Sequence, residues 1–223
     1  MTNFPPWEKM KPGDHPIHKH HDTRWIKRDA GHDVCRPYFK YSTSKWEQSM
    51  IDVYDVLFDP LKYLPISLLE IGIYYGESLR YFREYFKHPD TKLVGVDHYV
   101  FEEHARPGDN FIKEKGMQED TVFMNRVCNQ YGPFDIIMDD ASHDNSVTQD
   151  TFRRLWPFVN EGGFYIIEDV GAPVVLPLLN QVVLNHEGKG FISTYSLGFG
   201  PEAGAGTIAI IKKTKDTITG LTI

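Results

Sequence analysis

The chain has 223 residues, which is enough for one domain with a sizeable core. Hydrophobic residues make up 41% and charged residues 25%, an ordinary balance for a globular protein. The net charge of −7 argues against a nucleic-acid partner, because phosphate-binding proteins normally carry a basic excess or a basic stripe. No apolar run approaches the roughly 18 residues of a membrane span, and the N-terminus lacks an apolar signal core. We therefore expect a cytoplasmic protein without a membrane partner.

The two cysteines, Cys35 and Cys128, lie far apart, and no Cys-x-x-Cys motif occurs. This spacing indicates neither a disulfide framework nor a zinc site, so both are expected to be reduced thiols. Residues 1–43 are rich in proline, histidine and charge and lack clear periodicity, which predicts an irregular N-terminal arm or lid. Residues 44–223 are expected to form the catalytic domain.

Helices and strands are expected to alternate from Ser44 onward. Ser44 and Glu47 have the spacing of a capping box, and apolar residues then recur at helical spacing as far as Asp59-Pro60. Further along the chain we expect strands over 67–73, 93–97, 134–139 and 164–167, helices over 76–87, 117–130, 146–158 and near 173–185, and final strands near 191–197 and 206–212. This order predicts an α/β protein with a mostly parallel sheet, helices on both faces and an antiparallel C-terminal hairpin.

The turn after the first strand predicts a nucleoside ligand. In open α/β sheets, ligands bind beyond the carboxyl ends of the strands, where Gly72 and Gly76 allow close approach to the backbone. Asp97 ends the second strand, where a carboxylate can bind ribose hydroxyls. Tyr74 replaces the central glycine of the dinucleotide fingerprint, and the acidic Glu70 suits a cationic ligand better than a phosphate. S-adenosylmethionine meets these conditions, although the loop by itself could be an ordinary turn.

Two further strands each end in a pair of acids, Asp139-Asp140 and Glu168-Asp169. Neighbouring parallel strands would bring the four carboxylates together, and neither motif has an adjacent Lys or Arg to compensate them. A bound divalent cation would do so, and oxygen ligands favour Mg²⁺, Mn²⁺ or Ca²⁺ over Zn²⁺. His143 follows Asp140 by three residues and could remove a proton from a substrate hydroxyl, although an isolated histidine there would more often cap a helix.

Four motifs resemble a known family: LLEIGIYYGESL, KLVGVDHY, FDIIMDDASHDN and GGFYIIEDV. The chain is similar over residues 45–213 to the metal-dependent sugar O-methyltransferases of macrolide and aromatic polyketide biosynthesis, such as the mycinamicin and elloramycin enzymes. It is also similar to the related cephalosporin 7-methoxylation protein. The resemblance implies a class I methyltransferase fold with a seven-stranded sheet and S-adenosyl-L-methionine and Mg²⁺, or Mn²⁺, as cofactors.

The resemblance also implies roles for individual residues. The metal ligands would be Asp140, Glu168 and Asp169, and the base would be His143. The cofactor would be bound by Glu70, Gly72, Tyr75, Gly76, Ser78, Asp97, Gln118 and Asp139. Gly116-Met117-Gln118 matches the family's adenine-binding stretch only in part, because the acid is missing. Ala141 stands where the family usually has glycine.

Three rival interpretations stay open at this stage. A nicotinamide oxidoreductase would need the full glycine fingerprint, and a non-catalytic partner subunit would not need costly clustered acids. An O-methyltransferase of catechol-like phenols would carry the same acids as one that acts on a sugar or polyketide-type acceptor. Self-association through the arm and the aromatic-rich first helix also stays open.

Overall fold

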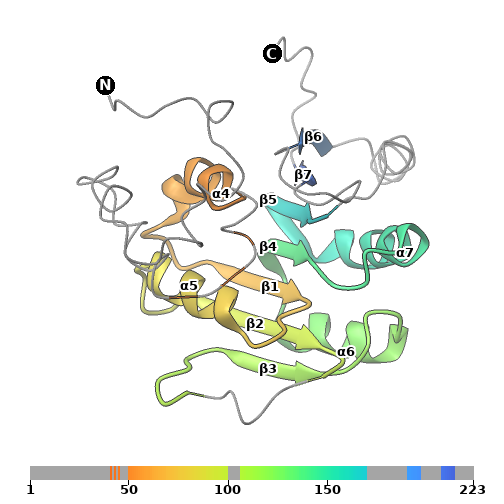
Figure 1. Ribbon diagram of the computed structural model, residues 1–223, viewed down its shortest axis with the longest axis horizontal. Coiled ribbons are helices and arrows are strands. Elements are labelled where there is room, and N and C mark those ends of the chain that lie inside the picture. Colours follow the sequence, from red (N-terminus) through yellow and green to blue (C-terminus); the bar gives the residue numbers. More distant parts are fainter. Residues whose placement is uncertain are drawn as a thin grey trace, which may run out of the picture.

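The computed structural model describes residues 41, 43, 45, 50–99, 106–169, 190–196 and 207–213. Seven strands form one sheet in the order β3-β2-β1-β4-β5-β7-β6 (Figure 1). The strands are β1 Ser67–Ile71, β2 Lys92–Asp97, β3 Ile112–Lys115, β4 Phe134–Asp139, β5 Val159–Ile167, β6 Gly190–Ser196 and β7 Thr207–Lys213. The first five are parallel, whereas β7 is antiparallel to both β5 and β6. The expected mostly parallel sheet with an antiparallel C-terminal hairpin is confirmed.

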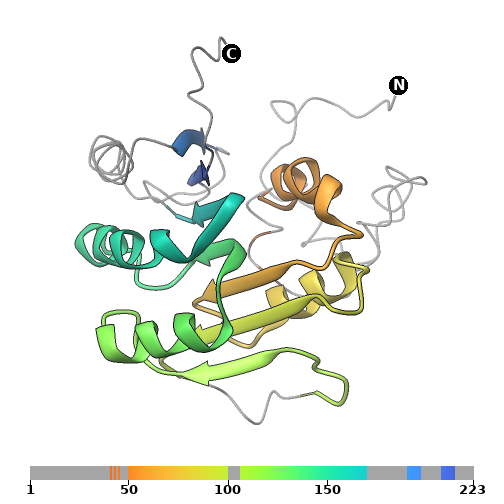
Figure 2. The same cartoon turned by 180° about the vertical axis from the view of Figure 1, so that it is seen from behind.

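Helices cover both faces of the sheet (Figures 1 and 2). The α-helices are α4 Met50–Phe58, α5 Glu77–Tyr85, α6 Thr121–Tyr131 and α7 Asn145–Leu155, and the 3-10 turns are η4 Asp59–Leu61 and η6 Trp156–Phe158. Helices α4 and α5 pack on one face, and α6 and α7 pack on the other. This three-layer arrangement follows from strands that are apolar on both sides.

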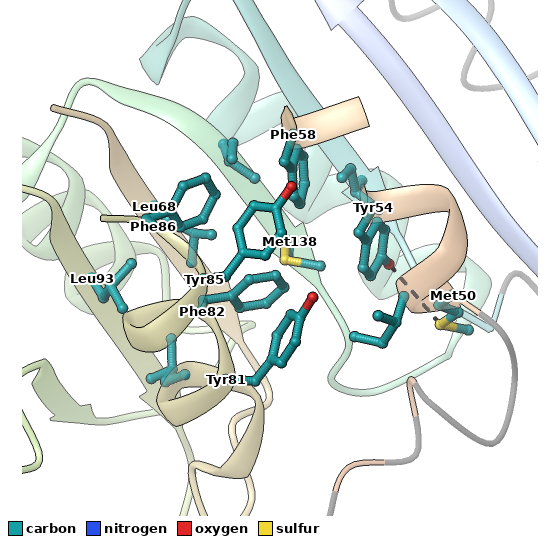
Figure 3. Packing of buried hydrophobic residues seen from close by; sticks show 14 of the residues in the cluster. Met50, Tyr54, Phe58, Leu68, Tyr81, Phe82, Tyr85, Phe86, Leu93 and Met138 are labelled. Carbon is teal, nitrogen blue, oxygen red and sulfur yellow. Dashed lines mark hydrogen bonds between the residues drawn. The ribbon is translucent and has the colours of Figure 1, made fainter. Parts of the chain in front are cut away.

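Aromatic side chains dominate the core under α4 and α5. Tyr54 and Phe58 of α4 meet Phe82 of α5 and Phe86, the residue that follows this helix (Figure 3). The ring centroid of Phe58 lies 5.4 Å from that of Tyr54 and 6.1 Å from that of Phe82. Leu68, Leu93 and Met138 close this core from the sheet side. Residues at alternate strand positions point to opposite faces, so their neighbours Leu69, Val94 and Ile137 enter the second core with α6 and α7. Cys128 lies buried in that second core as a free thiol.

The structure differs from the sequence-based expectation at three elements. Strand β3 was not expected, and α6 begins at Thr121 instead of residue 117, while β5 begins at Val159 instead of residue 164. Helix α6 starts late because Asp120 caps it, its side chain accepting hydrogen bonds from the backbone N–H groups of Val122 and Phe123. Residues 116–119 are therefore left in the turn between β3 and α6.

Several expectations fall outside the described residues. These are the arm of residues 1–43, of which only Tyr41 and Thr43 are described, with its five histidines and Cys35. The predicted helix start at Ser44 and the helix near 173–185 also lie outside the described residues. Within the described part of the chain, every helix is too short or too polar to cross a membrane.

Candidate active site

Four adjacent strands end at the same level, and their carboxyl ends form the floor of the candidate site. Ile71 of β1 pairs with Val96 of β2 on one side and with Asp139 of β4 on the other. Asp139 in turn pairs with Ile167 of β5. The residues that follow these strands, or end them, therefore lie side by side, as the sequence predicted: Asp97, Gly72, Asp140 and Glu168.

Gly72 begins the turn after β1 in a conformation that only glycine adopts easily, with a φ of +88°. A Cβ atom at this position would lie 2.0 Å from the backbone oxygen of Asp140. The chain that leaves β1 is therefore packed directly against the chain that leaves β4. Gly76, with a φ of +78°, lies at the start of α5 and completes the turn.

A cavity of about 700 Å³ opens beside this turn. It is lined by Ile71, Gly72, Tyr74, Val96, Asp97, His98, Tyr99, Gly116, Met117, Gln118, Glu119, Asp140, Ala141 and Ser142. Backbone N–H groups fix the Asp97 carboxylate at its wall, from Tyr74 at 2.8 Å and from Tyr99 at 3.0 Å. Tyr74, Tyr99 and Met117 are all at least half exposed. An acid held beside exposed flat and apolar side chains suits a ribose and its base.

Gln118 links the floor of this cavity to a buried acid. Its Nε2 donates a hydrogen bond of 2.7 Å to Oδ1 of Asp139, and its Oε1 accepts one of 3.2 Å from the backbone N–H of Ser142. Burial raises the pKa of Asp139 to about 7, with a contribution from neighbouring Asp140 and an opposing one from Gln118. Asp139 lines neither of the two cavities described here, so the structure places its carboxyl group beneath Gln118.

A second cavity of about 480 Å³ adjoins the first and shares Gly72, Tyr74 and Asp140 with it. Its other lining residues are Thr43, Lys45, Ile73, Tyr75, Glu77, Ser78 and Arg106. Tyr75 and Ser78, two of the predicted cofactor-binding residues, thus face this second space. Glu70 is fully buried behind it, where its Oε2 accepts a hydrogen bond of 2.7 Å from the Ser78 hydroxyl.

Lys45 binds three of the acids, and this contact was not foreseen from the sequence. Its Nζ lies 2.6 Å from Oδ2 of Asp140, 2.7 Å from Oε2 of Glu168 and 3.2 Å from Oε1 of Glu70. The Lys45 side chain is almost fully buried, and although burial disfavours its charge, the surrounding carboxylates raise its pKa well above the ordinary value. The acids therefore have a cation from the chain itself, supplied from 95 residues before Asp140.

Glu168 is held on both oxygens. Lys45 donates to Oε2, and the hydroxyl of Tyr54 in α4 donates a hydrogen bond of 2.7 Å to Oε1. Burial raises the pKa of Glu168, as does Asp140, while Lys45 and Tyr54 oppose the increase. Tyr54 is a second residue at the site that the sequence did not single out, because its helical spacing indicates only that it packs in the core.

Asp140, His143 and Asp169 form a group that can hold a metal ion. Each offers one ligand atom, and these atoms lie within 4.8 Å of one another. Nε2 of His143 is 3.8 Å from Oδ1 of Asp140, the oxygen opposite the one that contacts Lys45. His143 and Asp169 both have positive φ angles, of 54° and 50°, a strained backbone that is concentrated at functional sites. The two carboxylates supply the oxygen ligands that suit Mg²⁺ or Mn²⁺, and the imidazole of His143 lies beside them.

Comparison with known proteins finds similarity to methyltransferases. The family model described as a methyltransferase domain matches residues 69–170, which include all the acids of the site. A tetracenomycin-C rhamnosyl 3'-O-methyltransferase of Streptomyces olivaceus is 37% identical over 62% of this chain and 37% of its own length. Mycinamicin VI 2''-O-methyltransferase of Micromonospora griseorubida is 33% identical over 52% of this chain and 30% of its own length. The chain thus spans about a third of these curated relatives.

Among solved structures, the MycE methyltransferase of the mycinamycin biosynthetic pathway, in complex with Mg and SAH, matches with a TM-score of 0.66 and 22% identity. The match covers 94% of this chain and 63% of that chain. At this identity the match establishes the fold, which is the class I methyltransferase fold. The expected resemblance to sugar O-methyltransferases of antibiotic pathways is confirmed by the sequence comparisons.

Proposed function

We propose that this protein is an S-adenosyl-L-methionine- and divalent-cation-dependent O-methyltransferase that acts on a hydroxyl group of a small natural product, of the sugar-bearing polyketide or macrolide class. The observation that carries the proposal is that two adjoining cavities meet at Asp140, whose carboxylate lies within 4.8 Å of potential ligand atoms of Asp169 and His143. The named relatives methylate sugar hydroxyls of such compounds.

The two cavities divide the cofactor between them. Asp97 would bind the ribose in the first cavity, where Tyr74, Tyr99 and Met117 provide contacts for the base. Tyr75 and Ser78 line the second cavity, and Gly72 lines both, so this space suits the methionine end. Gln118 would contact the base, while Asp139 and Glu70 would act from beneath by holding Gln118 and Ser78 in place.

Asp140 and Asp169 would hold the cation together with Glu168, which lies outside the group of three residues whose ligand atoms are within 4.8 Å of one another, and His143 would stay off the metal. When bound, the cofactor supplies an electrophilic sulfonium methyl group and the cation supplies a Lewis acid that makes the acceptor hydroxyl more acidic. His143 would accept the hydroxyl proton at Nε2, the nitrogen that faces Asp140.

The first experiment tests the class of reaction. Isothermal titration calorimetry with S-adenosylmethionine and with NAD⁺ separates a methyltransferase from a nicotinamide oxidoreductase. Methyl transfer to macrolide glycosides and to catechols, with Mg²⁺ and with EDTA, then identifies the acceptor class. We expect cofactor binding and metal-dependent transfer to the glycoside. Binding of NAD⁺ alone, or transfer that persists in EDTA, would contradict the proposal.

His143→Ala tests the base. We expect kcat to fall by roughly 10²–10⁴-fold, because general-base catalysis contributes rate enhancements of this size. His88→Ala, on the loop after α5, is the matched control and should keep the wild-type rate. Cofactor affinity is measured on the same samples, and near-normal turnover of His143→Ala would refute the assignment.

A further inference from the structure

The ammonium group of Lys45 occupies the centre of the acid cluster. It reaches Glu70 on β1, Asp140 after β4 and Glu168 after β5, so it joins the ends of three neighbouring strands. Its Nζ donates hydrogen bonds to Asp140 and Glu168 and forms an ion pair of 3.2 Å with Oε1 of Glu70, a buried oxygen that has no hydrogen-bond partner. The residue is 1% exposed, so water does not share these contacts. One positive charge therefore faces three carboxyl groups.

Two of these three carboxylates, Asp140 and Glu168, are also those expected to hold the divalent cation. Their oxygens nearest to Lys45 lie 2.6 and 2.7 Å from its Nζ, which are full charge-assisted hydrogen bonds. The other oxygen of Glu168 already accepts a hydrogen bond from Tyr54. A cation that takes Glu168 as a ligand must therefore share one of its oxygens with Lys45 or with Tyr54.

Electrostatic repulsion opposes simultaneous close contact of the Lys45 ammonium and a divalent cation with the same carboxylates. Two cations that share a carboxylate lie only a few ångströms apart, where repulsion in a partly dehydrated site is strong even at a high effective dielectric constant. The acids attract both cations, but each reduces the attraction that remains for the other. Lys45 is tethered to the chain and cannot leave, whereas the divalent cation binds according to its concentration.

We propose that Lys45 is a resident cation that competes with the divalent cation for Asp140 and Glu168 and so lowers the metal affinity of the site. This inference rests on the proposed function, because it takes these acids as metal ligands. It makes Lys45 a positioning residue that keeps the acids assembled when no divalent cation is present and yields a carboxylate when one binds. The acids therefore bind the divalent cation with moderate affinity and release it reversibly.

The opposite role gives the opposite result. If Lys45 only oriented Asp140 and Glu168 as ligands, its removal would weaken metal binding, typically 10–100-fold for a residue that supports metal ligands. Competition predicts tighter binding instead, because the acids are released and the nearby positive charge is lost. The sign of the change in affinity therefore decides between the two roles.

The test measures Mn²⁺ affinity of the full chain by calorimetry and by electron paramagnetic resonance of free Mn²⁺. Lys45→Met keeps the length of the side chain and removes its charge, and we expect it to bind Mn²⁺ roughly tenfold more tightly or better. Lys45→Arg keeps the charge and should stay near the wild-type affinity. Lys62→Met is the matched control, since Lys62 is also buried but packs over the Tyr85 ring, and it should leave the affinity unchanged.

A thermal melt gives a second measurement. Lys45→Met should melt below the wild type without metal, because its acids lose their counter-ion, and Mn²⁺ should raise its melting temperature more than that of the wild type. If Lys45→Met does not fold without metal, Lys45→Met/Glu70→Gln removes one acid together with the ammonium and takes its place in the titration.

Mn²⁺ binding by Lys45→Met and by Lys45→Met/Glu70→Gln that is equal to or weaker than that of the wild type would refute the proposed competition. Absence of Mn²⁺ binding in every protein would overturn it too, together with the metal requirement of the proposed function. Titration of the same samples with S-adenosylmethionine separates failure of the competition from failure of the proposed function. If the cofactor binds but the Lys45 substitution does not change Mn²⁺ affinity, only the competition is refuted.

Discussion

At the scale of single residues, Gly72 has less room for a side chain than any other glycine that the structure describes. Alanine at this position would combine a φ of +88° with a Cβ atom 2.0 Å from the backbone oxygen of Asp140. Gly108 has a similar φ of +93°, but nothing lies within 4 Å of its Cβ position. We expect Gly108→Ala to cost roughly 1–2 kcal/mol from the backbone conformation alone. Gly72→Ala should cost about 2 kcal/mol more, because the clash adds to this strain.

Urea unfolding of both variants measures this difference, and calorimetry with S-adenosylmethionine measures its consequence. Gly72→Ala should also lose cofactor binding, because the shift needed to relieve the clash moves the wall shared by both cavities. Equal stability of the two variants would show that the turn is loose enough to accept a side chain, contrary to the geometry described above.

The acids at this site could be predicted one by one from the sequence, whereas their cation could not. Asp140 and Glu168 each follow directly after an apolar strand, a local pattern that also fixes their place in a parallel sheet. Lys45 lies 123 residues before Glu168, in a stretch where its neighbours show no related signal. A contact between such distant segments depends on how the chain before α4 packs, and a periodicity carries no information about that.

At the scale of elements, the start of α6 depends on Asp120. Its carboxylate accepts hydrogen bonds of 3.0 Å from the backbone N–H groups of Val122 and Phe123. Asp120→Ala should lower the free energy of unfolding by about 1 kcal/mol, the usual cost of a lost helix cap. Asp120→Ser, which still accepts a hydrogen bond, should lose less, and urea titration of the two variants provides the comparison. A similar loss in both would mean that the cap contributes little.

The two misplaced elements near the site have a common physical cause. Strand β3 has the sequence Ile-Lys-Glu-Lys at the sheet edge, so it lacks the apolar run by which a buried strand is recognised. The segment after it, residues 116–119, contains good helix formers but lies in a turn that lines the first cavity. The parallel pairing of β3 with β2 and the cap at Asp120 override these local propensities.

An ion-pair network ties α5 to the turn before β3. Arg80 donates to both oxygens of Asp109 at 2.7 Å, and it also bonds the backbone oxygen of Tyr75 at the second cavity. Partial burial opposes the charge of Asp109, but Arg80, the Arg106 backbone and Lys113 outweigh it and lower its pKa to about 2. The folded state therefore has a lower Asp109 pKa than the unfolded chain, where it is about 3.9.

Asp109→Asn should therefore destabilise the protein most above about pH 4, where the wild-type carboxylate is ionised in both states. The difference should shrink as the pH falls from about 4 to about 2, because protonation then removes the same interaction from the wild type. Urea unfolding at pH 6 and pH 3 measures it, with Asp150→Asn as control, because Asp150 pairs with Arg153 on an exposed surface. A difference that does not vary with pH would exclude an electrostatic origin.

At the scale of the whole molecule, the sheet separates two cores that share strands but not side chains. Ile136 and Ile137 are adjacent in β4, yet Ile136 packs with α4 and α5 residues while Ile137 packs with α6 and α7 residues. Both are fully buried. This two-sided apolar pattern was readable from the sequence, and it accounts for the agreement in fold class. The site is built on the edge where the two cores end.

The separation of the cores predicts how substitutions combine. Ile136→Val and Ile137→Val should each cost about 1 kcal/mol, the usual loss for a buried methylene group. Because the two side chains share no packing partners across the sheet, the double variant should equal the sum within about 0.5 kcal/mol. Leu68 pairs with Ile136 across β1 and β4 in the same core, so Leu68→Ala with Ile136→Val should deviate from additivity by about 0.5 kcal/mol or more. Urea unfolding of both cycles tests this, and equal coupling in the two pairs would mean that strain passes through the sheet.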